Sequence, residues 1–225
     1  MKVSAKGISK KYYRPSKNKS HFEALKNIDI DLNEGEFIKL SGRSGSGKST
    51  LLYILSALLF PNSGNVFFDD KDIYSLNDEK LSRFRNQNIG IIPQGQTGLQ
   101  ALTVLQNILL PTSLFESSEK YEDYAKELME KLEILHLASA KINELSGGEI
   151  RRMAIARSLI MNPKIIFADE PTDDLDSKNA ETVLNIFKEK SKNGTTIFLV
   201  THDNIVKKFA DTSYIMEAGT LMLEN

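Results

Sequence analysis

The sequence of 225 residues contains no cysteine. Disulfide bonds, thiolate catalysis and cysteine-ligated zinc are therefore excluded, and the composition fits a reducing cytoplasm. A long apolar run is missing as well. The longest one covers residues 51–60, is interrupted by Ser56, and is too short for the ~20 apolar residues of a membrane-spanning helix. If the protein serves a membrane process, we expect a separate chain to supply the membrane part.

An excess of charge of one sign is also absent. The chain has 29 lysine and arginine residues against 30 aspartate and glutamate residues, which gives a formal net charge of -1. No global positive field therefore favours nucleic acid, and we expect no nucleic-acid partner. The 40% hydrophobic and 26% charged fractions are those of an ordinary globular protein. The length allows one sizeable core with a small inserted subdomain.

Short apolar segments alternate with helical segments along much of the chain. Apolar and acidic residues alternate over 28–32, which predicts a half-buried strand. The other expected strands are 37–40, 65–68, 89–92, 164–168 and 195–200, followed by a hairpin over 211–217 and 220–223. The expected helices are 48–59, 153–160 and about 177–190. This alternation predicts an α/β fold, with a mostly parallel sheet and helices on its faces.

The stretch from about 96 to 160 has a different character. Tyr121, Tyr124, Leu128 and Leu132 fall on one face of a predicted helix, and strand-like runs are missing. We therefore expect a single domain over residues 1–225. Its α/β core is formed by 1–94 and 161–225, and a helical subdomain over 95–160 is inserted into that core.

A glycine-rich segment follows the expected strand 37–40. It matches the phosphate-binding pattern G-x-x-x-x-G-K-[ST] in full, with a helix expected after it. Such a loop curls so that its N–H groups face phosphate oxygens, and the helix N-terminus adds partial positive charge. The pattern places Lys48 at the β- and γ-phosphates and Ser49 at Mg²⁺. A flexible Gly/Ser loop is the alternative. The candidate site residues are Gly42, Arg43, Ser44, Gly45, Ser46, Gly47, Lys48, Ser49 and Thr50.

The expected strand 164–168 leads directly into Asp169 and Glu170. Carboxylates beside a buried strand are costly unless a cation compensates them, and Mg²⁺ on a bound nucleotide is such a cation. We expect Asp169 to lie near the metal and Glu170 to polarise a water molecule for attack on the γ-phosphate. A solvated strand end is the alternative, and the phosphate loop makes it the weaker one.

Residues 145–149 read Leu-Ser-Gly-Gly-Glu and resemble the LSGGQ signature of the ABC ATPase family. The resemblance covers essentially the whole chain. It implies a P-loop NTPase (RecA-like) core with an N-terminal antiparallel β part, and a helical subdomain that carries the signature. It also implies that Ser146, Gly147, Gly148 and Glu149 contact ATP held by a second subunit, so that a homodimer forms on ATP binding. A helix cap by Ser146 is compatible with this role.

The other elements of the family follow in order. Gln94 resembles the Q-loop glutamine, Asp176 the D-loop aspartate, and His202 the switch histidine that contacts the γ-phosphate. Tyr12 is the candidate for stacking on adenine, with Tyr13 as the alternative. By resemblance, the catalytic residues are Glu170, His202, Gln94 and Lys48. The residues at Mg²⁺ are Ser49, Gln94 and Asp169.

Three longer segments resemble one branch of the family, which contains lipoprotein-releasing, macrolide-export and antimicrobial-peptide-resistance ATPases. These segments are SGRSGSGKSTLLYIL, ADEPTDDLDSKNAETV and GTTIFLVTHD. The branch implies ATP hydrolysis at the cytoplasmic face of the cell membrane, coupled to a separate transmembrane permease. Three features depart from it: Pro93 before the Q-loop glutamine, the changed character of residues 95–100 after it, and Asp173-Asp174 where the branch has Gly-Asn. We hypothesise that these two carboxylates weaken dimer closure without ATP.

Two other roles share the same sequence features. Regulation of a membrane-anchored cell-wall hydrolase or signalling complex would use identical site chemistry, and this alternative stays open. A soluble ABC protein acting on DNA or ribosomes is disfavoured because the chain has one ATPase domain, no cysteine and no long heptad pattern. A catalytically inactive binding module is disfavoured because every catalytic position is filled.

Overall fold

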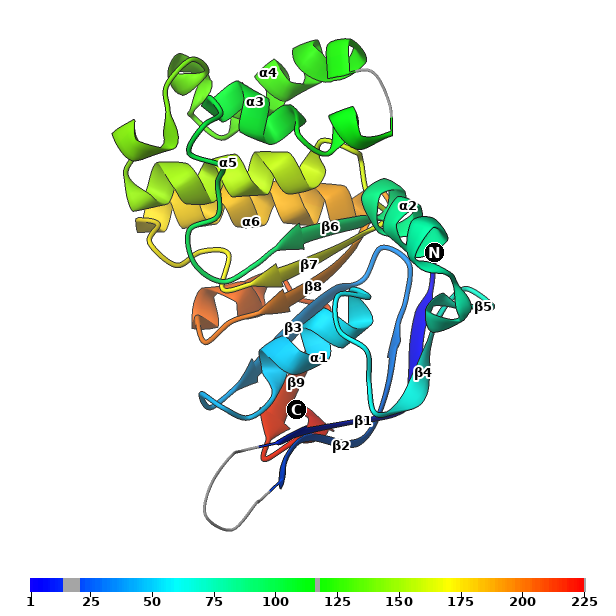
Figure 1. Cartoon of the computed structure of the whole chain (residues 1–225). Helices are drawn as coiled ribbons and strands as arrows, with labels where there is room; N and C mark the ends of the chain where they lie inside the picture. The colour runs from blue at the N-terminus through cyan, green and yellow to red at the C-terminus, as the bar shows by residue number, and fades with distance from the viewer. Residues whose placement is uncertain (14–20, 116–117, 225) are drawn as a thin grey trace.

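The computed structural model describes residues 1–13, 21–115 and 118–224 (Figure 1). Within these residues the strands form two sheets. The smaller, antiparallel sheet has the order β2-β1-β4-β5. Its strands are β1 (Val3–Tyr13), β2 (His21–Leu32), β4 (Ser63–Phe68) and β5 (Lys71–Asp72). The expected N-terminal antiparallel β part is thus confirmed.

The larger sheet has six strands in the order β10-β9-β3-β8-β7-β6. Every pair in it is parallel except the hairpin between β9 and β10. Its strands are β3 (Phe37–Gly42), β6 (Ile89–Ile92), β7 (Ile165–Asp169), β8 (Thr196–Val200), β9 (Thr212–Glu217) and β10 (Thr220–Leu223). The prediction of a mostly parallel sheet is confirmed.

Helices cover both faces of the six-stranded sheet (Figure 1). Helix α1 (Lys48–Leu55) packs on one face, and α5 (Gly147–Leu159) and α6 (Ser177–Lys192) pack on the other. Successive strand residues point to opposite faces. Phe167 of β7 therefore joins the hydrophobic cluster beneath α1, and its neighbour Ile166 joins the cluster beneath α5 and α6. Burial on both faces explains why the central strands are continuous apolar runs.

The segment between β6 and α5 is helical, and in the described residues its strand-type pairing is limited to an isolated bridge between Thr103 and Lys141. Its main helices pack on α5 and share one hydrophobic cluster with it. The division of the chain at 95–160 stays a prediction.

The remaining helices of the whole described chain are α2 (Asp78–Asn88), α3 (Val104–Leu109), α4 (Glu122–Lys131) and the 3₁₀ turns η1 (Ile73–Ser75), η2 (Thr112–Leu114), η3 (Ser118–Tyr121), η4 (Leu135–Leu137), η5 (Ile142–Glu144) and η6 (Asn204–Lys208).

Two predicted helix boundaries are wrong. The helix expected over 48–59 ends at Leu55, because Ala57 adopts a left-handed φ of 59° that a helix cannot continue through. The helix expected over 153–160 begins six residues earlier, because Ser146 caps its N-terminus. Among the described helices, none has the length and apolar composition required to cross a membrane.

Candidate functional site

The phosphate loop connects the end of β3 to the start of α1. Gly42 has a φ of 143°, and a side chain there would clash with the carbonyl oxygen of Met216. Gly47 has a φ of 112°, and a side chain there would clash in the same way with the carbonyl oxygen of Ala24. Glycine is therefore required at both positions. The loop holds the ammonium group of Lys48, which donates to the carbonyl oxygens of Gly42 at 2.8 Å and Arg43 at 3.1 Å.

A pocket of about 430 Å³ opens over this loop. It collects residues from both sheets and from the loops that follow β3, β6, β7 and β8. The predicted site residues that line it are Tyr12, Gly42, Ser44, Gly45, Gly47, Lys48, Ser49, Thr50, Gln94, Asp169, Glu170 and His202. Arg43 and Ser46 belong to the phosphate loop but do not line the pocket. Tyr13, the alternative to Tyr12, does not line it either.

Asp169 ends β7 at the floor of the pocket and is only 2% exposed. Burial is the main cause that raises the pKa of its carboxyl group, and a hydrogen bond from Ser49 opposes the shift. Its Oδ2 atom has no hydrogen-bond partner among the described residues. A buried carboxylate oxygen without a partner is unstable unless the site also binds a cation.

Glu170 follows with a left-handed φ of 48° and an exposure of 8%. This backbone conformation is uncommon for a residue with a side chain, and its cost is tolerated mainly at functional sites. The Oε1 atom of Glu170 lies 3.0 Å from Nδ1 of His202, which follows β8. This hydrogen bond, reinforced by the negative charge of Glu170, raises the pKa of His202. The two residues predicted to act on the γ-phosphate are thus already paired.

The signature residues lie at the start of α5. Ser146 is the N-cap, and its Oγ accepts a hydrogen bond from the backbone N–H of Glu149 at 3.4 Å. Glu149 in turn accepts from the backbone N–H of Ser146 at 2.7 Å and from its hydroxyl at 2.8 Å. These hydrogen bonds hold the pKa of Glu149 below its usual range. The predicted cap is confirmed, and the glutamate in the last place of the signature completes a capping box.

A second pocket, of about 580 Å³, lies at this helix end. Its walls come from the signature, the segment after Gln94, and the turn before α6, where Asp176 caps the helix by accepting from the backbone N–H of Asn179 at 2.9 Å. A side chain at Gly148 would meet the carbonyl oxygen of Asp174 at 3.0 Å, so this turn approaches the signature closely. The lining residues are Gln96, Ser146, Gly147, Gly148, Arg152, Asp174, Leu175, Asp176 and Asn179.

The two pockets share no lining residue. The predicted site therefore falls into two groups: the residues around the phosphate loop, and the signature group with Asp176. The chain does not bring these groups together. Glu149 belongs to the second group through its hydrogen bonds to Ser146, although it does not line the pocket itself.

A model of the ABC transporter family matches residues 25–173, which is more than half of the chain and includes the phosphate loop, Glu170 and the signature. The chain belongs to the ABC transporter family. As an ABC ATPase, it binds and hydrolyses ATP and is the nucleotide-binding subunit that powers transport.

Relatives and solved structures are similar to the ABC ATPase over most of their length. The chain is 44% identical to the lipoprotein-releasing system ATP-binding protein LolD of Leptospira interrogans over 182 residues. This alignment covers 80% of this chain and 77% of LolD. The chain is 39% identical over 224 residues to the uncharacterized ABC transporter ATP-binding protein YvrO of Bacillus subtilis, which covers 99% and 96% of the two chains.

The dimeric structure of the bacterial ABC transporter cassette MJ0796 aligns with a TM-score of 0.93 and 35% identity, over 99% of this chain and 98% of that one. A dimeric post-hydrolysis state of the same cassette, bound to ADP and Pi, aligns with a TM-score of 0.92 and 36% identity, with the same coverage. The predicted RecA-like fold is confirmed by these similarities.

Some pocket residues of the ABC ATPase escaped the sequence analysis. Phe22 lines the first pocket and lies opposite Tyr12 in the pairing of β1 with β2. Only the register of this ladder, which the sequence did not reveal, brings Phe22 to the pocket. Gln96 and Arg152 line the second pocket because they flank Gln94 and the signature. Their proximity to those motifs was a usable signal.

Proposed function

We propose that two copies of the ABC ATPase bind two ATP molecules between them, head to tail, and hydrolyse them to drive a separate transmembrane permease. Each ATP is held by the first pocket of one chain and the second pocket of the other. The separation of the two pockets within one chain carries this proposal. Each pocket contains a helix N-terminus, which attracts phosphate. The similarity to a dimeric cassette supports the arrangement.

The residues present fit Mg²⁺. An unpartnered buried carboxylate oxygen on Asp169, close to the hydroxyl of Ser49, forms part of the oxygen-rich ligand set that Mg²⁺ prefers. We propose that Ser49, Gln94 and Asp169 hold the ion. When bound, Mg²⁺ neutralises charge on the β- and γ-phosphate oxygens.

The proposed catalytic residues divide the remaining work. Glu170 polarises the attacking water, and its hydrogen bond to His202 fixes its orientation beforehand. His202 and Lys48 stabilise the negative charge on the phosphoryl group that is transferred. Gln94 would hold the ion and relay the state of the site to the permease through the segment that follows it. Positioning and electrostatics dominate phosphoryl transfer, so no covalent intermediate with the protein is needed. Tyr12 is proposed to stack on the adenine base.

We propose that the permease binds the ABC ATPase at the cytoplasmic face of the membrane, as a peripheral subunit. Support comes from the lipoprotein-releasing relatives, which indicate export or mechanical coupling. We propose that the permease contacts the segment after Gln94, and two arginines of α5 hold the chain on either side of Gln94. Arg151 donates to the carbonyl oxygen of Pro93 at 2.9 Å, and Arg157 donates to the hydroxyl of Thr97 at 2.8 Å.

The experiment that tests the proposal uses tagged Glu170→Gln protein with ATP and Mg²⁺. Light scattering is expected to show a stable dimer, with ATP turnover reduced by about 10²- to 10⁴-fold, as for loss of a general base. Lys48→Ala, which removes a phosphate contact, is expected to stay monomeric. Wild-type turnover in Glu170→Gln would show that Glu170 does not polarise the attacking water.

A pull-down from solubilised membranes tests the membrane partner. It is expected to recover a permease, and recovery of a membrane-anchored hydrolase instead would indicate regulation.

A further inference from the structure

Asp173 brings a third ionisable group to the pair formed by Glu170 and His202. A carboxylate oxygen of Asp173, one of Glu170 and a ring nitrogen of His202 all lie within 4.8 Å of one another. The turn after β7 produces this geometry, because the backbone N–H of Asp173 donates to the carbonyl oxygen of Glu170 at 3.2 Å. Asp173 is half-buried, whereas its neighbour Asp174 is exposed and lines the second pocket instead.

The groups that face His202 are acidic and come from three elements. Glu170 at the end of β7 has the largest effect, first through its hydrogen bond and then through its charge, and it raises the pKa of His202. Asp173 in the turn and Asp203 at the start of η6 raise this pKa further, and desolvation opposes them. The side chain of His202 is 75% exposed, so water screens part of each effect.

The groups around Asp173 explain why it needs a cation. Burial is the main cause that raises the pKa of Asp173, and the charges of Glu170 and Asp174 add to it. His202 and Arg151 act in the opposite direction, His202 from within the cluster and Arg151 from α5. Two carboxylates at this distance repel each other unless a cation compensates them. The His202 ring, when protonated, supplies a positive charge within 4.8 Å of both carboxylates.

We infer that Asp173 is a positioning residue that, together with Glu170, holds the His202 ring as its imidazolium cation. The inference rests on the proposed role of His202 in ATP hydrolysis. A charged donor binds an anionic phosphate more strongly than a neutral one. A group whose pKa is raised by its neighbours keeps its proton to a higher pH. Asp173 therefore extends the working range of the site towards alkaline pH.

The titration of the histidine rings tests the inference directly. The chain has three histidines, His21, His136 and His202, so carbon-detected or ¹³C-edited NMR of the full chain resolves each ring. The signal of His202 is assigned by its loss in His202→Ala. In Asp173→Asn, the pKa of His202 is expected to fall below its wild-type value.

Asp174→Asn is the matched control, because it removes the same charge one residue away, from a side chain outside the cluster. It is expected to lower the pKa of His202 by less than Asp173→Asn does. An unchanged His202 titration in Asp173→Asn, or an equal fall in both variants, overturns the inference.

ATP turnover as a function of pH gives a second readout. In Asp173→Asn, the alkaline loss of activity is expected to begin at a lower pH than in the wild type, and an unmoved alkaline limb overturns the inference. His202→Ala separates the two possible failures. Wild-type turnover in His202→Ala shows that the proposed role of His202 is wrong. An inactive His202→Ala, combined with an unmoved titration in Asp173→Asn, overturns the role of Asp173 alone.

Discussion

Arg151 donates from Nη1 to the carbonyl oxygen of Pro93 at 2.9 Å, across 58 residues of sequence. Arg151 lies two residues after the signature, and Pro93 directly precedes Gln94. The arginine is only 2% exposed, so the hydrogen bond is shielded from water. It joins the start of α5, which forms the second pocket, to the loop that reaches the first. This one buried contact therefore connects the neighbourhoods of the two pockets within the chain.

Replacing Arg151 with methionine should destabilise the protein and lower ATP turnover. The substitution keeps much of the buried aliphatic length but leaves the carbonyl oxygen of Pro93 without its donor. The cost of an unsatisfied buried group is about 1–3 kcal/mol. Chemical denaturation measures the loss of free energy of unfolding. Lys208→Met, which removes an exposed lysine from η6, is the control and is expected to leave stability within ~0.5 kcal/mol of wild type.

Ser146→Ala should reduce both stability and turnover, whereas Thr103→Ala should reduce stability alone. Both residues are N-caps with a complete capping box, at α5 and α3 respectively. Loss of an N-cap costs about 1 kcal/mol, and thermal denaturation should show similar losses in the two variants. Only Ser146 lines the second pocket. Equal turnover in the two variants would show that Ser146 serves the helix and not ATP.

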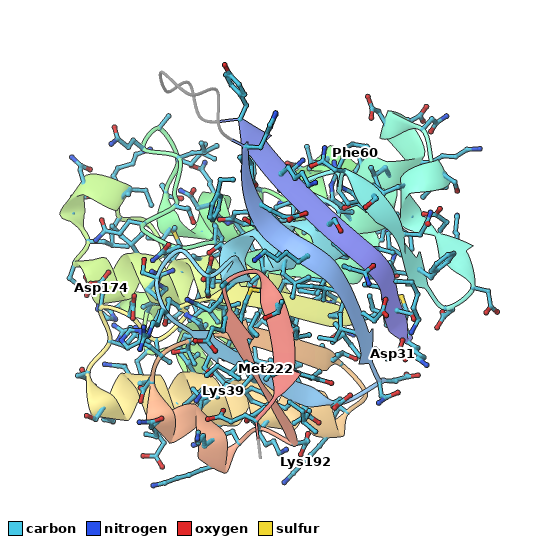
Figure 2. All side chains as sticks on the ribbon, turned by 90° about the horizontal axis from the view of Figure 1, so that it is seen from below. Asp31, Lys39, Phe60, Asp174, Lys192 and Met222 are labelled. Atoms are coloured by element: carbon cyan, nitrogen blue, oxygen red, sulfur yellow. The ribbon has the colours of Figure 1, made fainter. Side chains whose placement is uncertain are left out.

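Lys39→Met should stabilise the protein at neutral pH. Lys39 is 2% exposed in β3 and lies near the β9–β10 hairpin that carries Met222 (Figure 2). Burial is the main cause that lowers the pKa of Lys39 below its usual 10.5, and the charge of Glu224 opposes the shift. Exchanging a buried charge for an apolar side chain of similar volume is expected to be neutral or to add about 1–4 kcal/mol.

The pH dependence of this effect has a definite sign. Because the folded state disfavours the proton on Lys39, the cost of the charge is fully present below the folded pKa. It is relieved as the pH rises from the folded pKa towards 10.5. The stability difference between Lys39→Met and wild type should therefore shrink on the alkaline side. Denaturation at pH 7 and at successively higher pH measures it, and a difference that grows instead would contradict the assignment.

Asp174→Asn should strengthen dimerisation without nucleotide, and Asp173→Gly combined with Asp174→Asn should do so at least as much. Asp174 is exposed and lies beside Gly147 and Asp176 in the second pocket, the surface proposed to meet the other chain. An interaction between two exposed charges contributes about 0.2–1 kcal/mol. Removing the charge of Asp174 from this surface should therefore change the dissociation constant of the dimer by up to about fivefold. Light scattering at low salt measures the effect, which should fade at high salt because the charges are screened.

Central strands and motifs could be predicted from the sequence because local patterns determine them. Strand β6 matches its predicted range of 89–92, since a short apolar run in a buried parallel strand has clear ends. The phosphate-loop residues and Glu170 were found because they are contiguous with apolar strands. The helix after Asn77 was not predicted, because α2 buries only Leu81 and has no apolar stripe to reveal it.

Contacts between distant segments could not be predicted in this way. The pairing of Tyr12 with Phe22 depends on the register of β1 with β2, which contains irregularities that sequence patterns do not specify. The approach of Asp173 to His202 depends on the left-handed backbone of Glu170, a conformation the sequence gives no reason to expect. The hydrogen bond from Arg151 to Pro93 joins helix α5 to the loop after β6, and their relative positions follow only from the packed fold.

The separation of the two pockets has a consequence for the kinetic order of the reaction. If a complete site forms only between two chains, the hydrolysis rate of a dilute solution grows with the second power of protein concentration. A chain free in solution then consumes almost no ATP. Two copies tethered to one permease experience a high effective concentration, so they encounter each other without any change in their own affinity. Assembly on the partner would thus confine ATP consumption to the place where it is coupled to work.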